Sequence, residues 1–295
     1  MQFKERFVKA NRNLRKSSIG TYMRNIKRLA KMRGLDEIPD HAKWLTKKLF
    51  NIVKSEKLNT RKLLSAAAVK VLNLYKKKTG QWGTLMLEAT REYDDVREKR
   101  QKTPRERALW PKGGFPAVWK AAERFARDVD RNPDTLVGLR ALQDTWLLSF
   151  YATHTPRLIE TVMLSPKATN RLVKKGRGWE LVLGEHKTSG SRGASRFMLH
   201  KRLNNITSKF VQALKRLGKP FLLVNARGGQ LSKSGLSKRL VVITRKAGLG
   251  SGFSAQILRV LKSTANRDTI MSAQDLEAEM GHGQRESRRY AKKDT

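Results

Sequence analysis

Cysteine is absent from all 295 residues of this chain, so disulfides, thiolate zinc sites and cysteine nucleophiles are excluded together. Acidic residues are scarce, because 25 Asp and Glu stand against 64 Lys and Arg and leave a formal net charge of +39. No stretch approaches the ~18 consecutive apolar residues of a membrane-spanning helix, and the N-terminal MQFKERFVKA lacks the apolar centre of a secretory signal. We therefore expect an intracellular protein, in a prokaryotic cytoplasm or in the nucleus of a host cell, whose chemistry uses oxygen and nitrogen groups.

Apolar residues make up 39% of the sequence and include six Trp, which indicates folded cores and excludes a purely disordered basic tail. A positive charge of this size repels itself within a compact body unless a polyanion binds to it. Nucleic acid is therefore the expected partner, and a membrane is not. The length of the chain exceeds the usual size of one hydrophobic core and favours two domains.

The first part of the chain is predicted to be helical. Apolar residues recur at helical spacing in four segments, 18–32, 41–54, 60–78 and 84–97. In 18–32 the apolar residues fall on one stripe and the basic residues on the other faces. We expect a helical domain with a basic surface over 1–105, a linker rich in Pro, Gly and positive charge over 106–116, and a second domain over 117–295.

The second domain mixes helices with a few strands. Helical spacing predicts six helices, over 117–129, 134–152, 204–217, 232–248, 254–268 and 273–280. Two strand patterns, 179–183 and 196–200, flank the Gly/Ser-rich segment 188–194 and predict a hairpin, and 220–224 is a further strand candidate. The predicted fold class is thus mainly α with a small β-sheet or hairpin (α+β), and the strongly apolar helix over 134–152 is expected at its centre.

Four segments of this second domain carry residues suited to phosphate chemistry. They are THTPRLIETVML with Arg157 and Glu160, EHKTSGSRGASRFML with Lys187, QILRVLKSTAN with Gln256 and Arg259, and MGHGQRESRRYAK with His282 and Tyr290. Their order and spacing resemble the motifs of the tyrosine recombinase (phage integrase) family: Arg157 lies 30 residues before Lys187, Arg259 lies 23 before His282, and Tyr290 follows eight later. The helical first part, particularly SSIGTYMRNIKRLAKMRG, is similar to the core-binding domain of the same family.

This resemblance implies an enzyme that cuts and rejoins DNA without a metal, another cofactor or ATP. Tyr290 would attack the phosphodiester and become linked to the DNA 3′ phosphate. Arg157 and Arg259 suit a clamp on the nonbridging oxygens, because guanidinium groups are planar bidentate donors that keep their charge. Lys187 would protonate the leaving 5′ oxygen, and His282 would bind the same phosphate or assist proton movement. Glu160 is expected to orient the region around Arg157.

Two features depart from the family pattern. Gln256 stands where a histidine is usual, and an amide can donate a hydrogen bond but cannot take up a proton, so activation of the nucleophile is expected to be weaker. The sequence also ends five residues after Tyr290, whereas many relatives continue into a helix that docks in a neighbouring subunit. We expect a two-domain clamp around double-stranded DNA and a homo-tetramer on the recombination site that uses another contact, with a monomer or weak oligomer when free.

A set of basic and hydroxyl side chains outside these motifs is expected to contact the DNA backbone and to set affinity without selecting sequence. It comprises Arg12, Arg15, Lys16, Arg24, Lys27, Arg28, Arg192, Arg196, Ser232, Lys233 and Ser234.

Simpler interpretations remain for single residues and for the whole chain. Lys187 lies among surface lysines, His282 follows Gly281 and suits a helix cap, and Tyr290 suits ordinary packing. The predicted function is site-specific recombination or DNA integration by the enzyme of a mobile element or virus, including transposition and viral genome integration. The alternatives are a type IB topoisomerase or telomere resolvase, which share the tyrosine and arginine chemistry, and a catalytically silent DNA-binding protein of the same fold, an interpretation favoured by Gln256.

Overall fold

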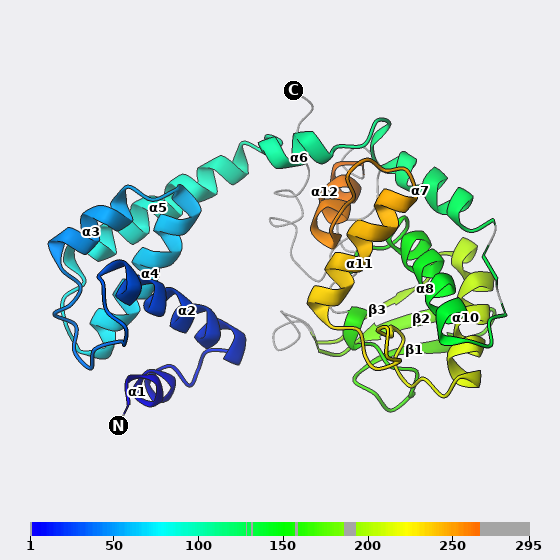
Figure 1. Cartoon of the computed structure of the whole chain (residues 1–295), viewed down its shortest axis with the longest axis horizontal. Coiled ribbons are helices and arrows are strands. Elements are labelled where there is room, and N and C mark those ends of the chain that lie inside the picture. The colour runs from blue at the N-terminus through cyan, green and yellow to red at the C-terminus, as the bar shows by residue number, and fades with distance from the viewer. Residues whose placement is uncertain (1, 128, 131, 157–158, 186–192, 266–295) are drawn as a thin grey trace. The chain divides into compact units, whose positions relative to one another are not determined.

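The structure is a computed structural model, and it describes residues 2–127, 129–130, 132–156, 159–185 and 193–265. The chain divides into two compact units, Met1–Lys99 and Arg100–Thr295 (Figure 1). Residues 106–116, predicted as a linker, lie within the second unit, where Leu109, Trp110 and Phe115 pack against its core. The assignment of a DNA-binding role to the first part and a catalytic role to the second stays a prediction.

The described part of the first unit is helical. Its helices are α1 (Phe3–Ala10), α2 (Lys16–Met32), α3 (Lys47–Lys54), α4 (Leu58–Leu74) and α5 (Gly80–Glu98). α4 contacts α2, α3 and α5 and thus lies at the centre of the unit. The last four helices were predicted with shifted ends, whereas α1 was not predicted although Phe3 and Phe7, one helical turn apart, are both buried.

Helix α2 shows how the spacing of apolar residues directs the folding of the first unit. Ile26 and Leu29 are fully buried, and Ile19 and Met23 pack against the same core cluster, so the predicted apolar stripe is confirmed. Lys27 and its basic neighbours on the other faces are exposed. Burial of one stripe stabilises the helix and leaves its basic face in water.

The second unit is mainly helical and contains a small sheet. Its described elements are α6 (Pro104–Leu109), α7 (Gly114–Phe125), α8 (Leu136–Tyr151), η1 (Ile159–Thr161), β1 (Asn170–Lys175), β2 (Gly178–Leu183), β3 (Ser195–Met198), η2 (Lys201–Leu203), α10 (Asn204–Arg216), α11 (Lys233–Lys246) and α12 (Ala255–Ala265). Helix α6 is short and was not predicted from the sequence. Thr103 and Glu106 form a reciprocal capping box at its N-terminus. The predicted helix 273–280 lies outside the described residues.

The three strands form an antiparallel sheet in the order β1-β2-β3. β1 pairs with β2 from Asn170↔Leu183 to Lys175↔Gly178, and β2 pairs with β3 from Glu180↔Met198 to Leu183↔Ser195. The predicted hairpin of β2 and β3 is therefore confirmed, while β1 adds a strand that was not predicted. The candidate strand 220–224 forms only isolated bridges, through Phe221 and Val224.

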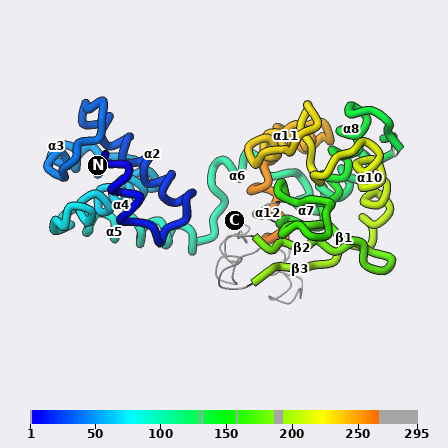
Figure 2. The backbone as a smooth tube through the Cα atoms, turned by 90° about the horizontal axis from the view of Figure 1, so that it is seen from below, coloured from blue at the N-terminus to red at the C-terminus, as the bar shows by residue number. Residues whose placement is uncertain are grey.

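Helix α8 is the centre of the second unit, as predicted. It packs against α7, α10 and α11, and Figure 2 shows these helices gathered on one side of the sheet. Trp146 and Phe150 are fully buried on it, and Trp146 Nε1 donates a hydrogen bond of 3.0 Å to Thr207 Oγ1 of α10. The C-terminal end of this rigid helix leads directly into the segment that carries the first predicted site residues.

Candidate active site

The turn after α8 is held by two cations of α12. Arg259 Nε donates a hydrogen bond of 3.2 Å to the carbonyl oxygen of Thr155, and Lys262 Nζ donates one to the carbonyl oxygen of Thr153. Residues three apart lie on the same face of a helix, so one face of α12 secures both carbonyls. This arrangement joins two of the predicted motifs across 104 residues of sequence.

Arg259 also shares its surroundings with Tyr151 and Glu160. Tyr151 is fully buried, and burial raises the pKa of its phenol well above the usual range; the positive charge of Arg259 opposes this shift and the negative charge of Glu160 adds to it. Glu160 is itself buried, in η1, where its backbone carbonyl accepts a 2.9 Å hydrogen bond from Gln230 Nε2. The structure therefore brings Arg259 and Glu160 to one region, while the predicted role of Glu160 in orienting the region around Arg157 stays a prediction.

Gln256 lies in the first turn of α12, one turn before Arg259, and its side chain is exposed. Arg259 is partly buried. An exposed amide beside an anchored guanidinium can donate a hydrogen bond to an anion that approaches this end of the helix. This placement suits a phosphate ligand that enters from solvent.

Two residues at this site were missed in the sequence. Lys262 is only 4% exposed although it is a lysine. Its position within the apolar run of α12, ILRVLK, was an available indication, because a buried lysine needs oxygen partners. His154, also buried, lies between the two carbonyls that α12 holds. Nothing in the sequence showed which atoms it contacts.

Five predicted site residues lie outside the described residues: Arg157, Lys187, Arg192, His282 and Tyr290. Their roles stay predictions.

The structure describes the other residues that were predicted to contact DNA. All six basic residues of the first unit in this set are exposed: Arg12, Arg15, Lys16, Arg24, Lys27 and Arg28. In the second unit, Arg196 of β3 is exposed, and its Nη1 lies 3.9 Å from Glu180 Oε2. Ser232 caps α11 by accepting a 3.1 Å hydrogen bond from Gly235 N, and it is exposed, as are Lys233 and Ser234. A helix N-terminus with exposed hydroxyls and a lysine suits contact with a phosphate.

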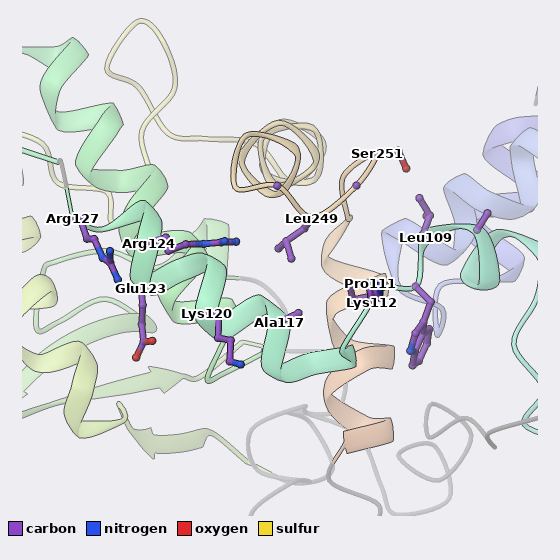
Figure 3. A pocket seen from close by; sticks show the side chains of 14 residues that line it. Leu109, Pro111, Lys112, Ala117, Lys120, Glu123, Arg124, Arg127, Leu249 and Ser251 are labelled. Atoms are coloured by element: carbon purple, nitrogen blue, oxygen red, sulfur yellow. The ribbon is translucent and has the colours of Figure 1, made fainter.

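A cavity of about 630 Å³ lies elsewhere in the second unit, between α7, the segment after α6 and the loop that follows α11 (Figure 3). Its charged lining residues are Lys112, Lys120, Glu123, Arg124 and Arg127. None of the predicted catalytic residues that the structure describes lines it. The cavity is therefore separate from the candidate active site, and its positive charge favours an anionic occupant.

Among the described residues, no group of three or more His, Asp or Glu side chains could hold a metal ion. No helix in the described part of the chain is long and apolar enough to cross a membrane.

Solved structures of tyrosine recombinases share this fold. The XerH site-specific recombinase bound to its difH substrate in a pre-cleavage complex matches with a TM-score of 0.60 at 15% identity, over 97% of this chain and 80% of that chain. XerH bound to palindromic difH in a post-cleavage complex matches at 0.55 and 13%, over 95% and 77% of the two chains. A lambda integrase dimer bound to a COC′ core site matches at 0.54 and 16%, over 97% and 75%.

No family model matches the sequence, and none of the curated proteins is similar to it in sequence. The likeness is therefore one of structure. This chain has the tyrosine recombinase fold, mainly helical with a small antiparallel sheet, and the expectation drawn from its motifs is confirmed at the level of fold.

Proposed function

We propose that this chain is a site-specific tyrosine recombinase that cuts and rejoins double-stranded DNA through Tyr290. The observation that carries the proposal is the hydrogen bond between Arg259 Nε and the carbonyl oxygen of Thr155. It connects the motif of Arg259 to the segment that precedes Arg157 by two residues, within a fold shared with recombinases. Two arginine motifs that meet in this way can provide the paired guanidinium groups that phosphoryl transfer without a metal needs.

The proposed reaction exchanges one phosphodiester for another. The Tyr290 phenol oxygen attacks phosphorus, its proton is lost, and a bond forms between tyrosine and the DNA 3′ phosphate while the bond to the 5′ oxygen breaks. Lys187 protonates that leaving oxygen. A 5′ hydroxyl of another strand then attacks the phosphotyrosine and releases Tyr290, so bond energy is retained and no ATP is consumed.

The other predicted site residues stabilise negative charge on the phosphate or hold the catalytic groups in position. Arg157, Arg259 and His282 bind the nonbridging oxygens, where negative charge grows in the transition state. Gln256, exposed one turn from Arg259, donates a hydrogen bond to the same phosphate and leaves proton transfer to other groups. Glu160, buried beside Tyr151 and Arg259, keeps the arginine region in place.

DNA is held by charge over both units. The exposed basic residues of α2 and the α11 N-terminus contact backbone phosphates, and the two parts of the chain close around the duplex as a clamp. Four subunits exchange strands on paired sites. The natural role is integration or transposition of a mobile element or viral genome.

Two alternatives have observable consequences. A type IB topoisomerase would use the same chemistry without pairing two sites, and a silent DNA-binding protein would form no covalent bond. Gln256 favours the silent protein, since it replaces a group that can carry a proton.

Trapping the covalent complex separates these three functions. Purified protein is mixed with fragmented DNA from its source, denatured, and the DNA that stays attached is sequenced. We expect adducts at one recurring site. Scattered adducts would instead identify a topoisomerase, and binding that weakens steeply with salt but yields no adduct would identify a silent DNA-binding protein.

A further inference from the structure

The turn after α8 is secured on a second side by its own histidine. His154 Nε2 accepts a hydrogen bond of 2.9 Å from the backbone N–H of His200. His200 follows the last residue of β3 by two positions and caps η2. The turn therefore connects three elements: α8 by chain continuity, α12 through Arg259 and Lys262, and the end of β3 through His154.

The His154 ring is packed between two phenyl rings. Its centroid lies 5.5 Å from that of Phe150 on α8 and 5.3 Å from that of Phe197 on β3. Phe197 pairs with Leu181, so this contact reaches β2 as well. Ring packing and the hydrogen bond together fix the base of the β2–β3 hairpin against the turn.

Both histidines act as hydrogen-bond acceptors here and are therefore neutral at these nitrogens. His154 accepts at Nε2, which assigns the ring proton to Nδ1, and His200 Nδ1 accepts from the backbone N–H of Arg202 at 3.3 Å. The charged groups that act on His200 are Lys262 from α12 and Lys201 and Arg202 from η2, and Arg202 also lies 3.7 Å from Glu123 of α7. Burial, followed by His154 and these cations, lowers the pKa of His200.

We propose that His154 is a positioning residue for DNA cleavage: by holding the end of β3 against the turn after α8, its ring fixes the Thr155 carbonyl that orients Arg259. This role rests on the function proposed above. Arg259 acts on the reacting phosphodiester, so the carbonyl that orients it must be held in place, and a displacement of ~1 Å can cost about 10²-fold in rate.

The test compares two pairs of variants in single-turnover cleavage of a nicked DNA site, with DNA affinity measured in parallel. His154→Phe keeps an aromatic ring but loses the acceptor, and we expect cleavage to fall by about 10- to 100-fold with little change in Kd. His154→Gln keeps an acceptor that cannot be protonated, and we expect it to restore most of the rate.

A second pair of variants changes His200, the hydrogen-bond donor, instead of His154, the acceptor. His200 has a φ of −56°, which proline adopts without strain, so His200→Pro deletes the N–H while keeping the backbone path. His200→Ala is its matched control, because it also loses the Nδ1 acceptor that caps η2 but retains the N–H. We expect the proline variant to lose rate as His154→Phe does and the alanine variant to keep it.

The outcomes separate the two proposals. Wild-type adducts together with unimpaired His154→Phe and His200→Pro variants would overturn the positioning role alone, as would a Gln variant as slow as Phe. A wild type that forms no adduct on its own site would overturn the proposed function and the positioning role with it.

Discussion

Arg259 is held in one orientation by its surroundings. Its Nε is committed to the Thr155 carbonyl, which fixes the plane of the guanidinium, and the charge lies beside the buried phenol of Tyr151. Lysine has neither the Nε donor nor the planar fork. The orientation of this side chain is therefore a property of arginine that a lysine cannot reproduce.

Arg259→Lys is expected to reduce single-turnover cleavage by about 10²- to 10³-fold, the usual loss when one oriented donor to a developing oxyanion is removed. DNA affinity should change little, since other cations contact the backbone. Arg245→Lys is a matched control, because Arg245 is exposed on α11 and its Nε likewise donates to a carbonyl, that of Ser251, at 3.2 Å. Equal cleavage by the two variants would remove Arg259 from the reaction.

Gln256→His is expected to keep or raise the cleavage rate, because an exposed imidazole at this position adds a group that can carry a proton. Rates measured across pH 6 to 9, roughly the range of histidine function, report the effect. A large loss of rate in this variant, with normal DNA binding, would show that the glutamine amide has a role of its own.

At the scale of elements, α8 and α11 are joined by an ion pair whose carboxylate is buried and whose guanidinium is partly buried. Arg239 Nε donates to Asp144 Oδ1 at 2.6 Å, and Arg239 Nη2 contacts Asp144 Oδ2. The Asp144 side chain is 7% exposed and that of Arg239 25%. A bidentate pair of this kind specifies how two helices pack more than it stabilises them.

Asp144→Ala is therefore expected to cost about 3–5 kcal/mol of folding free energy, since it leaves the Arg239 guanidinium without its carboxylate. The double variant Asp144→Leu/Arg239→Leu should recover most of this loss, because it removes both charges. Thermal unfolding followed by circular dichroism measures both. The comparison pair is Arg28–Glu56, whose side chains are 49% and 26% exposed, and there Glu56→Ala should cost only about 0–1 kcal/mol. Similar losses at the two sites would contradict a special role for the buried Asp144 carboxylate.

Elements with a strong apolar period were predictable from sequence, and those without one were not. The central helix α8 has apolar residues at helical spacing, and β2 and β3 flank a polar turn, so both were recognised. β1, with the sequence NRLVKK, has charged residues at its end and was missed because pairing with β2, rather than its own pattern, makes it a strand. α1 is short, and burial of Phe3 and Phe7 in the core of its unit stabilises it.

Residues of the candidate site could be proposed from the sequence only where they belong to a recognised motif. Gln256, Arg259 and Glu160 followed from motif spacing. Lys262 and His154 did not, because their importance depends on partners 109 and 46 residues away. Such contacts are created by the packing of α8, α12 and β3 and leave no local pattern in the sequence.

At the scale of the whole molecule, excess positive charge is the dominant property, because the chain has 64 Lys and Arg and only 25 Asp and Glu. Binding to DNA should accordingly weaken in proportion to the number of phosphates contacted as salt rises. The exposed basic residues of α2 are expected to contribute to this dependence without selecting sequence.

Arg24→Gln/Lys27→Gln is expected to reduce the slope of log K against log salt by about 1 for each phosphate contact removed, uniformly over DNA sequences. Lys215→Gln is the control, because Lys215 is exposed on α10 and is not among the predicted contacts. Fluorescence anisotropy over a salt series measures the slopes. An unchanged slope in the double variant would place the DNA elsewhere.

If this chain breaks DNA with one tyrosine, identification of the DNA-linked peptide is the most direct measurement of that chemistry. Wild type and Tyr290→Phe are incubated with a nicked site, digested with protease, and the peptide attached to the DNA 3′ end is sequenced by mass spectrometry. We predict a single phosphotyrosine peptide containing Tyr290 in wild type, and none in Tyr290→Phe although it binds DNA equally well. An adduct on another residue, or cleavage that persists in Tyr290→Phe, would contradict the account.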